Sequence, residues 1–255
     1  MVKGLDTFLE HFKGFETSYV LIGGTACDIW LGANGLPFRA TKDLDIVLIV
    51  EALNATFLKR FWEFVQAGRY ESMEQSERRP EFYRFVRPAS PDHPFMIELL
   101  TRNHLNLPEG VHLTPIFADE DISSLSAILL NDEYYRYVVG NRVVTDGASI
   151  VPAKCLIPLK ARAWLDLTQR RDEGDTTVKG DDIKKHRNDA FRLYLSLASS
   201  DRFALPERLA ADLKAFLARH PADLPEWTAI RQAVGIDVMP VPAAVLEQIR
   251  AIFML

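Results

Sequence analysis

The sequence has 255 residues, of which 48% are hydrophobic and 25% charged, and its formal net charge is −5 at pH 7. This length favours two modest domains, and the negative charge disfavours a broad nucleic-acid-binding surface. With only Cys27 and Cys155 as cysteines, a disulfide scaffold is disfavoured as well. No segment approaches the roughly 20 apolar residues of a membrane span, and the first residues are too charged for a signal peptide. We therefore expect a soluble, cytoplasmic protein that does not contact membranes.

The first informative stretch predicts a strand, a glycine turn and a helix. Residues 18–22 are apolar enough for a short strand, Gly23-Gly24 forms a tight turn, and residues 25–31 have helical apolar spacing. Glycines let the backbone approach a ligand closely, and the N–H groups at the start of a helix bind anions. This turn is therefore a candidate phosphate site.

Two carboxylates follow at the start of a second strand. Asp43 and Asp45 precede residues 46–50, an uninterrupted apolar run typical of a strand buried on both faces. Residues two apart in a strand share a face and lie about 6 to 7 Å apart. Two anions placed there repel each other and lose solvation unless a cation neutralises them. A divalent metal beside a phosphate site indicates a nucleoside triphosphate with magnesium.

These residues resemble the nucleotidyltransferase superfamily built on the polymerase-beta fold. The motif is Gly-Gly-Thr-Ala at residues 23–26 followed by Arg-x-Thr-x-Asp-Leu-Asp at residues 39–45, and it is most similar to the AbiEii/AbiGii toxin-like branch. The resemblance implies an α/β protein with a mixed-sheet nucleotidyltransferase domain followed by an all-helical domain. We place these domains at residues 1–150 and 151–255. It also implies Mg²⁺ or Mn²⁺ as cofactor and a nucleoside triphosphate as substrate.

The resemblance assigns roles to individual residues. Asp43, Asp45 and a third carboxylate on a neighbouring strand would hold the metal and act as the catalytic residues. Glu98 fits the third place, because it is the only polar residue in FMIELL. The alternative for Glu98 is a structural salt bridge, since a buried charge must be paired. The expected nucleotide-binding residues in this domain are Gly23, Gly24, Thr25, Arg39 and Thr41.

The rest of the first domain is predicted from turn signals and alternation. Residues 71–80 and 101–126 have weak periodicity and predict loops. Gly140-Asn141 is a two-residue hairpin signature that would close the domain. The strands predicted around these segments are residues 81–87, 95–100, 134–139 and 142–145.

The second half is predicted to be helical. Lys160 interrupts the apolar stripe of a helix over residues 152–169. It would either snorkel to solvent or, as the similar toxins imply, contact the triphosphate. Asp182, together with Lys179, partly matches a Lys-Asp motif of the same branch and is a second candidate nucleotide contact, with helix capping as the alternative. Further helices are predicted at residues 5–15, 54–68, 181–199, 206–219, 225–233 and 242–253.

The expected reaction is magnesium-dependent transfer of a nucleoside monophosphate from a triphosphate to an acceptor hydroxyl. Residues 154–192 hold ten Lys and Arg against seven Asp and Glu, a net charge of +3, which suits tRNA or another RNA as acceptor but is also typical of a solvated helix face. The toxin–antitoxin resemblance implies an antitoxin protein as a further partner. The alternatives are a small-molecule (antibiotic-type) nucleotidyltransferase and an inert relative that binds nucleotide or a partner protein.

Overall fold

The computed structural model describes residues 2–49, 55–76, 82–100, 114–116, 128–129, 131–235 and 239–255. Contacts divide the chain into two compact units, each discontinuous in sequence. The first unit comprises Met1–Ile122 and Asn141–Pro152, and the second comprises Ser123–Gly140 and Ala153–Leu255. The chain therefore passes between the units more than once, whereas the sequence predicts a single boundary at residue 150.

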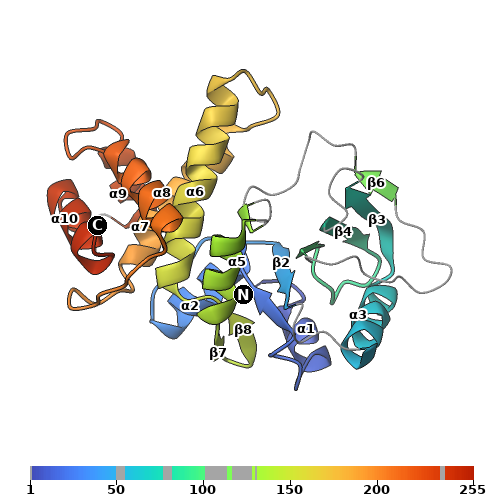
Figure 1. The fold of residues 1–255 in the computed structure, drawn as a ribbon. Helices are drawn as coiled ribbons and strands as arrows, with labels where there is room; N and C mark the ends of the chain where they lie inside the picture. The colour runs from blue at the N-terminus through green and yellow to red at the C-terminus, as the bar shows by residue number, and fades with distance from the viewer. Residues whose placement is uncertain are drawn as a thin grey trace. The chain divides into compact units, whose positions relative to one another are not determined.

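A mixed β-sheet organises the first unit (Figure 1). In the described residues its order is β6-β3-β4-β5-β2-β1-β8-β7. Strand β2 pairs antiparallel with β1 and parallel with β5, so it is central, as the apolar run after Asp45 predicts. Val50, the predicted end of this run, lies outside the described residues. The strands are β1 (Tyr19–Leu21), β2 (Asp43–Leu48), β3 (Tyr70–Ser76), β4 (Phe82–Pro88), β5 (Met96–Leu100), β6 (Thr114–Ile116), β7 (Val143–Thr145) and β8 (Ala148–Ile150).

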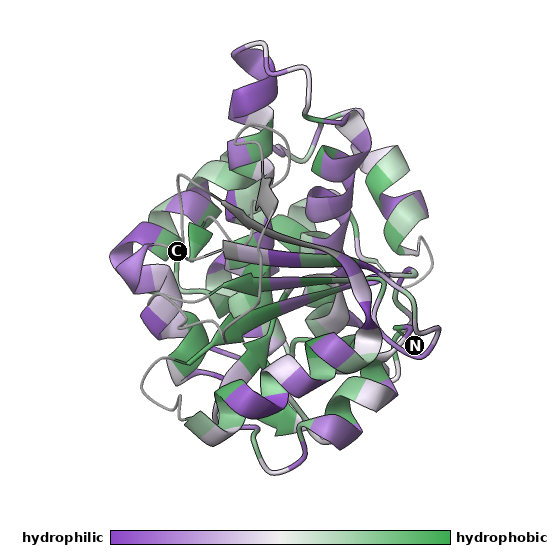
Figure 2. Ribbon diagram, turned by 90° about the vertical axis from the view of Figure 1, so that its right-hand side faces the viewer, coloured by the Kyte–Doolittle hydropathy of each residue, from purple (hydrophilic) through white to green (hydrophobic). Residues whose placement is uncertain are grey.

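One face of this sheet is covered by α1 (Leu5–His11) and α3 (Ala55–Gly68). The ring of Phe12, just after α1, lies 5.5 Å from that of Phe64 on α3 and 6.1 Å from that of Tyr19 on β1. Phe61 on α3 lies 5.9 Å from Phe85 on β4. Such tilted and edge-on aromatic pairs add to the large apolar area that these rings bury. Figure 2 shows the corresponding amphipathic colouring, with purple and green residues alternating along the helices.

The loop predicted over residues 71–80 is wrong for its first part, because residues 70–76 form strand β3. The sequence signal was weak since this polar segment has little intrinsic strand preference. Its conformation comes from tertiary pairing, antiparallel to β4 and parallel to β6. Three predicted stretches lie outside the described residues. They are residues 77–80, most of the loop predicted over residues 101–126, and Asn54, the first residue of the helix predicted over residues 54–68.

The hairpin predicted at Gly140-Asn141 is also wrong. Residues 132–140 form helix α5 (Asp132–Gly140), whose N-terminus is capped by the Asn131 side chain accepting from the Glu133 N–H at 3.0 Å. The actual hairpin joins β7 and β8 through Asp146-Gly147. Both residues have positive φ, 50° and 76°, as a two-residue type I′ turn requires.

The second unit is helical in its described residues. Its helices are α5, α6 (Ala153–Asp172), α7 (Gly180–Tyr194), α8 (Glu207–Ala218), α9 (Trp227–Val234) and α10 (Pro242–Ile252). The Asp212 carboxylate of α8 accepts from the Tyr134 hydroxyl of α5 at 2.8 Å and from the Arg162 guanidinium of α6 at 3.3 Å, which joins these three helices. None of the described helices combines the length and apolarity needed to cross a membrane.

His220 makes the stability of the second unit depend on pH. Its ring is buried between Trp164 and Phe216, and burial lowers the pKa of His220 to about 4 from 6.5. Between pH 6.5 and 4, His220 is therefore protonated in the unfolded chain but not in the folded chain. The free energy of unfolding falls as pH falls through this window, by on the order of 3 kcal/mol. We expect His220→Phe to show a smaller loss over the same window in urea titrations. Equal losses in both proteins would contradict this assignment.

Candidate functional site

The alternation of side chains along β2 separates an apolar face from a charged one. Tyr19 of β1 contacts Phe8 of α1, with ring centroids 5.2 Å apart, and pairs with Leu48 of β2. Paired residues share a face, so Leu48 points toward the α1 and α3 layer. Asp43 and Asp45 lie an odd number of positions from Leu48. Their side chains therefore emerge on the opposite face of the sheet.

Glu98 joins the two aspartates on this face. Strand β5 is parallel to β2, and Asp45 pairs directly with Glu98. Side chains at paired positions on neighbouring strands lie about 5 Å apart. Asp45 and Glu98 are both buried, with 9% and 6% of their surface exposed, whereas Asp43 is half-buried. The three predicted carboxylates therefore occupy one face of two adjacent central strands.

Arg84 is a cation on this face that the sequence analysis does not predict. Arg84 of β4 pairs with Glu98 of β5, and its Nη2 and Nε atoms donate to Glu98 Oε1 at 2.5 and 3.0 Å. The other carboxylate oxygen, Oε2, is buried and has no hydrogen-bond partner in the described part of the chain. The salt bridge that the sequence offers as one reading of Glu98 is therefore present through Oε1, and the reading as a metal ligand stays a prediction.

The glycine turn packs directly against the Asp45 carboxylate. Gly23 has φ +66°, and a Cβ atom there would lie 1.8 Å from Asp45 Oδ2. The turn is also joined to the strand ladder, since the Ile22 N–H donates to the Asp45 carbonyl at 3.0 Å. Gly23 begins helix α2 (Gly23–Ala33), whose first N–H groups have no intrahelical acceptor. The positive end of α2 therefore lies beside this carboxylate, where it favours negative charge.

The neighbouring motif residues hold the turn in place. A Cβ atom on Gly24 would lie 2.5 Å from Thr41 Oγ1, so the absence of a side chain lets Thr41 pack against the turn. The Thr25 hydroxyl is fully buried and donates to the Asp43 carbonyl at 2.8 Å. That donor is committed to the strand, which favours a positioning role for Thr25. Arg39 stacks on Phe38, 4.9 Å from its ring centroid.

The carboxylate face suits a hard divalent cation in its chemistry. Magnesium and manganese prefer carboxylate oxygens, and the unpartnered Oε2 of Glu98 is a buried acceptor of this kind. As placed, no three His, Cys, Asp or Glu side chains converge on one point in the described ranges. Coordination by all three carboxylates would therefore require rotation of side chains on this face.

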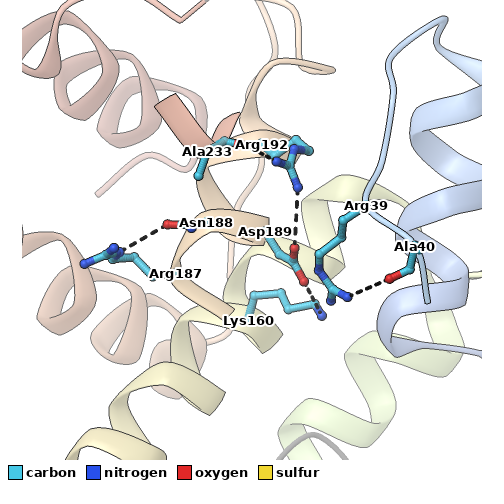
Figure 3. A network of polar contacts seen from close by, with 8 residues as sticks. All are labelled: Arg39, Ala40, Lys160, Arg187, Asn188, Asp189, Arg192 and Ala233. Carbon is cyan, nitrogen blue, oxygen red and sulfur yellow. Dashed lines mark hydrogen bonds and ion pairs between the residues drawn. The ribbon is translucent and has the colours of Figure 1, made fainter. Parts of the chain in front are cut away.

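The other two predicted nucleotide contacts belong to the helical unit. Lys160 of α6 does not snorkel, because its side chain is buried and its Nζ lies 3.0 Å from Asp189 Oδ2 of α7 (Figure 3). Arg192 lies on the other side of Asp189, with Nη1 3.9 Å from Oδ1. The sequence analysis does not predict the role of Asp189. A carboxylate at a buried position of α7 could have indicated a buried ion pair. Asp182 lies half-buried in the first turn of α7.

In the basic stretch of residues 154–192, two cationic side chains that could contact RNA already have partners within the protein. Lys184 lies 3.5 Å from Asp181, and Arg187 is half-buried beside Asn188, with a pKa lowered by burial. The Lys184–Asp181 contact agrees with the reading of a helix face whose charges are paired with acidic neighbours.

No family model matches the chain, and no curated protein resembles it significantly. Among solved structures, the fold is similar to the crystal structure of an antigenic nucleotidyltransferase-like protein from Paracoccidioides brasiliensis. The TM-score is 0.40 and the identity 15%, with 89% of each chain covered. A likeness this distant says nothing about the chemistry of this chain.

Proposed function

We propose that the protein is a nucleotidyltransferase that moves a nucleoside monophosphate from a nucleoside triphosphate to an acceptor hydroxyl. The observation that carries this proposal is the packing of the Asp45 carboxylate against Gly23 at the start of α2. It brings together a helix start suited to phosphate and a carboxylate face suited to a metal. Both are needed to hold a triphosphate with its metal ion.

Asp43, Asp45 and Glu98 would hold Mg²⁺ or Mn²⁺ on the charged face of β2 and β5. When bound, the metal supplies charge neutralisation at the phosphates and lowers the pKa of the attacking hydroxyl. The N–H groups at the start of α2 would donate to phosphate oxygens, and Arg39 would add positive charge near the turn. The carboxylates also offer a site to which the acceptor hydroxyl can pass its proton.

The remaining roles are predictions from the sequence. They are a nucleotide contact by Lys160 or Asp182, tRNA or another RNA as acceptor, and an antitoxin as partner. Lys160 already has a buried carboxylate partner in Asp189. A contact with nucleotide would therefore have to coexist with that ion pair.

The proposal is tested by incubating the full-length protein with each α-labelled triphosphate, magnesium and total cellular RNA. Label in one RNA fraction would support the proposal and identify the acceptor class. Label only in a small-molecule pool, when a cell extract replaces RNA, would support the transfer but change the acceptor. Absence of label from every fraction under both conditions would contradict transferase activity.

The aspartate substitutions should separate function from folding. We expect Asp43→Asn and Asp45→Asn each to lower magnesium-dependent labelling by at least about 100-fold. Mutation of a residue that only hydrogen-bonds a metal ligand already lowers metal affinity or activity about 10- to 100-fold, and these two residues would be ligands themselves. Stability should stay equal or rise, since one repelling charge is removed. Calorimetric magnesium titration and urea unfolding measure the two effects. Asp92→Asn, an exposed change in the same unit, is the matched control. Unchanged magnesium affinity in both Asp43→Asn and Asp45→Asn would contradict the proposed metal site.

A further inference from the structure

Arg84 makes an asymmetric ion pair with Glu98. It sits near the middle of β4 with 9% of its surface exposed, and both of its bonding nitrogens reach the same oxygen of Glu98. A side-on pair of an arginine with a carboxylate often uses both oxygens, with one N–H for each. Here Oε1 takes both N–H groups and Oε2 takes none, so the two oxygens of Glu98 are in different environments.

The register extends this asymmetry across the sheet. Arg84 pairs with Glu98, and Glu98 pairs with Asp45, so the three side chains form one row over β4, β5 and β2. The arginine holds the oxygen of Glu98 at one side of the row. The Asp45 carboxylate lies at the other side. Oε2 is therefore the oxygen of Glu98 that Arg84 leaves available to a cation shared with the aspartates.

The charge of this face fits a divalent ion. Arg84 offsets one of the three negative charges of Asp43, Asp45 and Glu98, which leaves a negative excess that favours a cation. Arginine is suited to this place because its charge persists at any physiological pH and its donors are held in a rigid plane. A lysine would supply the same charge without the fixed direction.

We propose that Arg84 is a positioning residue of the metal site, which fixes Glu98 as a one-oxygen ligand through Oε2. This inference rests on the proposed function, because it assumes that Asp43, Asp45 and Glu98 bind the cation. It assigns Arg84 no contact with the nucleotide or the metal. Its action on the metal passes through Glu98 alone.

Arg84→Lys tests this role, because it keeps the charge and removes the rigid pair of donors. Removing the charge instead would strengthen the attraction of the carboxylates for a cation and obscure the loss of orientation. We expect Mn²⁺ affinity of the full-length protein, measured by calorimetry and by the electron paramagnetic resonance of free Mn²⁺, to fall 10- to 100-fold. Arg87→Lys is the matched control, since Arg87 lies on the same strand in an exposed pair with Glu71 at 3.7 Å. Its affinity should equal that of the wild type.

A double-mutant cycle with Glu98→Gln separates positioning from general stabilisation. If Arg84 acts through Glu98, Arg84→Lys should change Mn²⁺ affinity less than about twofold in the Glu98→Gln background. An equal loss in both backgrounds would overturn the inference. Thermal unfolding without metal shows whether each variant is folded.

A measurement on the wild type keeps the inference testable if Arg84→Lys does not fold. In crystals of the wild-type protein with Mn²⁺, Glu98 should bind the ion through Oε2 while Oε1 stays on Arg84. Coordination through both oxygens would overturn the role of Arg84. If the wild type binds Mn²⁺ and Arg84→Lys binds it equally well, the role of Arg84 is overturned and the proposed function stands. If the wild type does not bind Mn²⁺, the proposed metal site itself is overturned.

Discussion

Gly23→Ala is expected to destabilise the protein by about 2 to 4 kcal/mol and to abolish nucleotide transfer. Two effects add. A non-glycine residue at φ +66° costs about 1 to 2 kcal/mol, and the new methyl group would overlap Asp45, lying 1.8 Å from Oδ2 and 2.8 Å from Cγ. Relief requires either the helix start or the carboxylate to move, and both belong to the proposed site. Urea unfolding and the labelling assay measure the two losses.

Gly35→Ala provides a closely matched control. Gly35 has φ +69°, and no described atom lies within 4 Å of the place where its Cβ would be. It should therefore show only the conformational cost, with transfer intact. Asp45→Ala removes the overlapping atoms, so Gly23→Ala should cost clearly less stability in that background. Equal losses for Gly23→Ala and Gly35→Ala would show that the contact with Asp45 has no energetic weight.

Lys160→Met and Asp189→Asn are expected to cost about 3 to 5 kcal/mol each in the free energy of unfolding. The pair is buried, with 1% and 0% of the two side chains exposed, and removing one partner leaves the other charge in a poorly solvating environment (Figure 3). Arg192 also contacts Asp189, so Asp189→Asn disturbs two cations and should be the more damaging change. Urea titration at pH 7 measures both.

Two comparisons make this result specific. The double variant Lys160→Met/Asp189→Leu replaces the pair by apolar groups and should lose much less than the sum of the single losses. Lys184→Met breaks an exposed pair with Asp181, 3.5 Å apart, and should change stability very little. Additive losses in the double variant would show that the two charges are stabilised independently of each other.

The sequence predicts the parts of the site that depend on local pattern. Asp43 and Asp45 share a face because alternation along a strand is a local property, and the glycine turn before a helix is local as well. The structure shows why residue 23 is a glycine, because a side chain there would overlap the Asp45 carboxylate. That reason depends on two segments meeting in space and is invisible along the chain.

The missed residues share this origin. Arg84 becomes part of the site only through the register of β4 on β5, and the partner of Lys160 becomes evident only through the packing of α7 on α6. Of the two wrong element predictions, the one for β3 has this origin and the one for α5 has a local origin. Strand β3 forms from polar residues because neighbouring strands supply its hydrogen bonds. The residues of α5 favour a helix because Asn131 caps its start, which outweighs the β-forming side chains that predicted a strand.

The central claim is transfer of a nucleoside monophosphate at the carboxylate face, and paired labelling tests it most directly. The triphosphate that gives the strongest transfer is supplied once with the label on the α-phosphate and once with it on the γ-phosphate, with magnesium or with a chelator. We expect the α-label to reach the acceptor and the γ-label to leave with pyrophosphate, only with magnesium and not in Asp45→Asn. Transfer of the γ-label to the acceptor, or α-label transfer that persists in Asp45→Asn, would contradict the account.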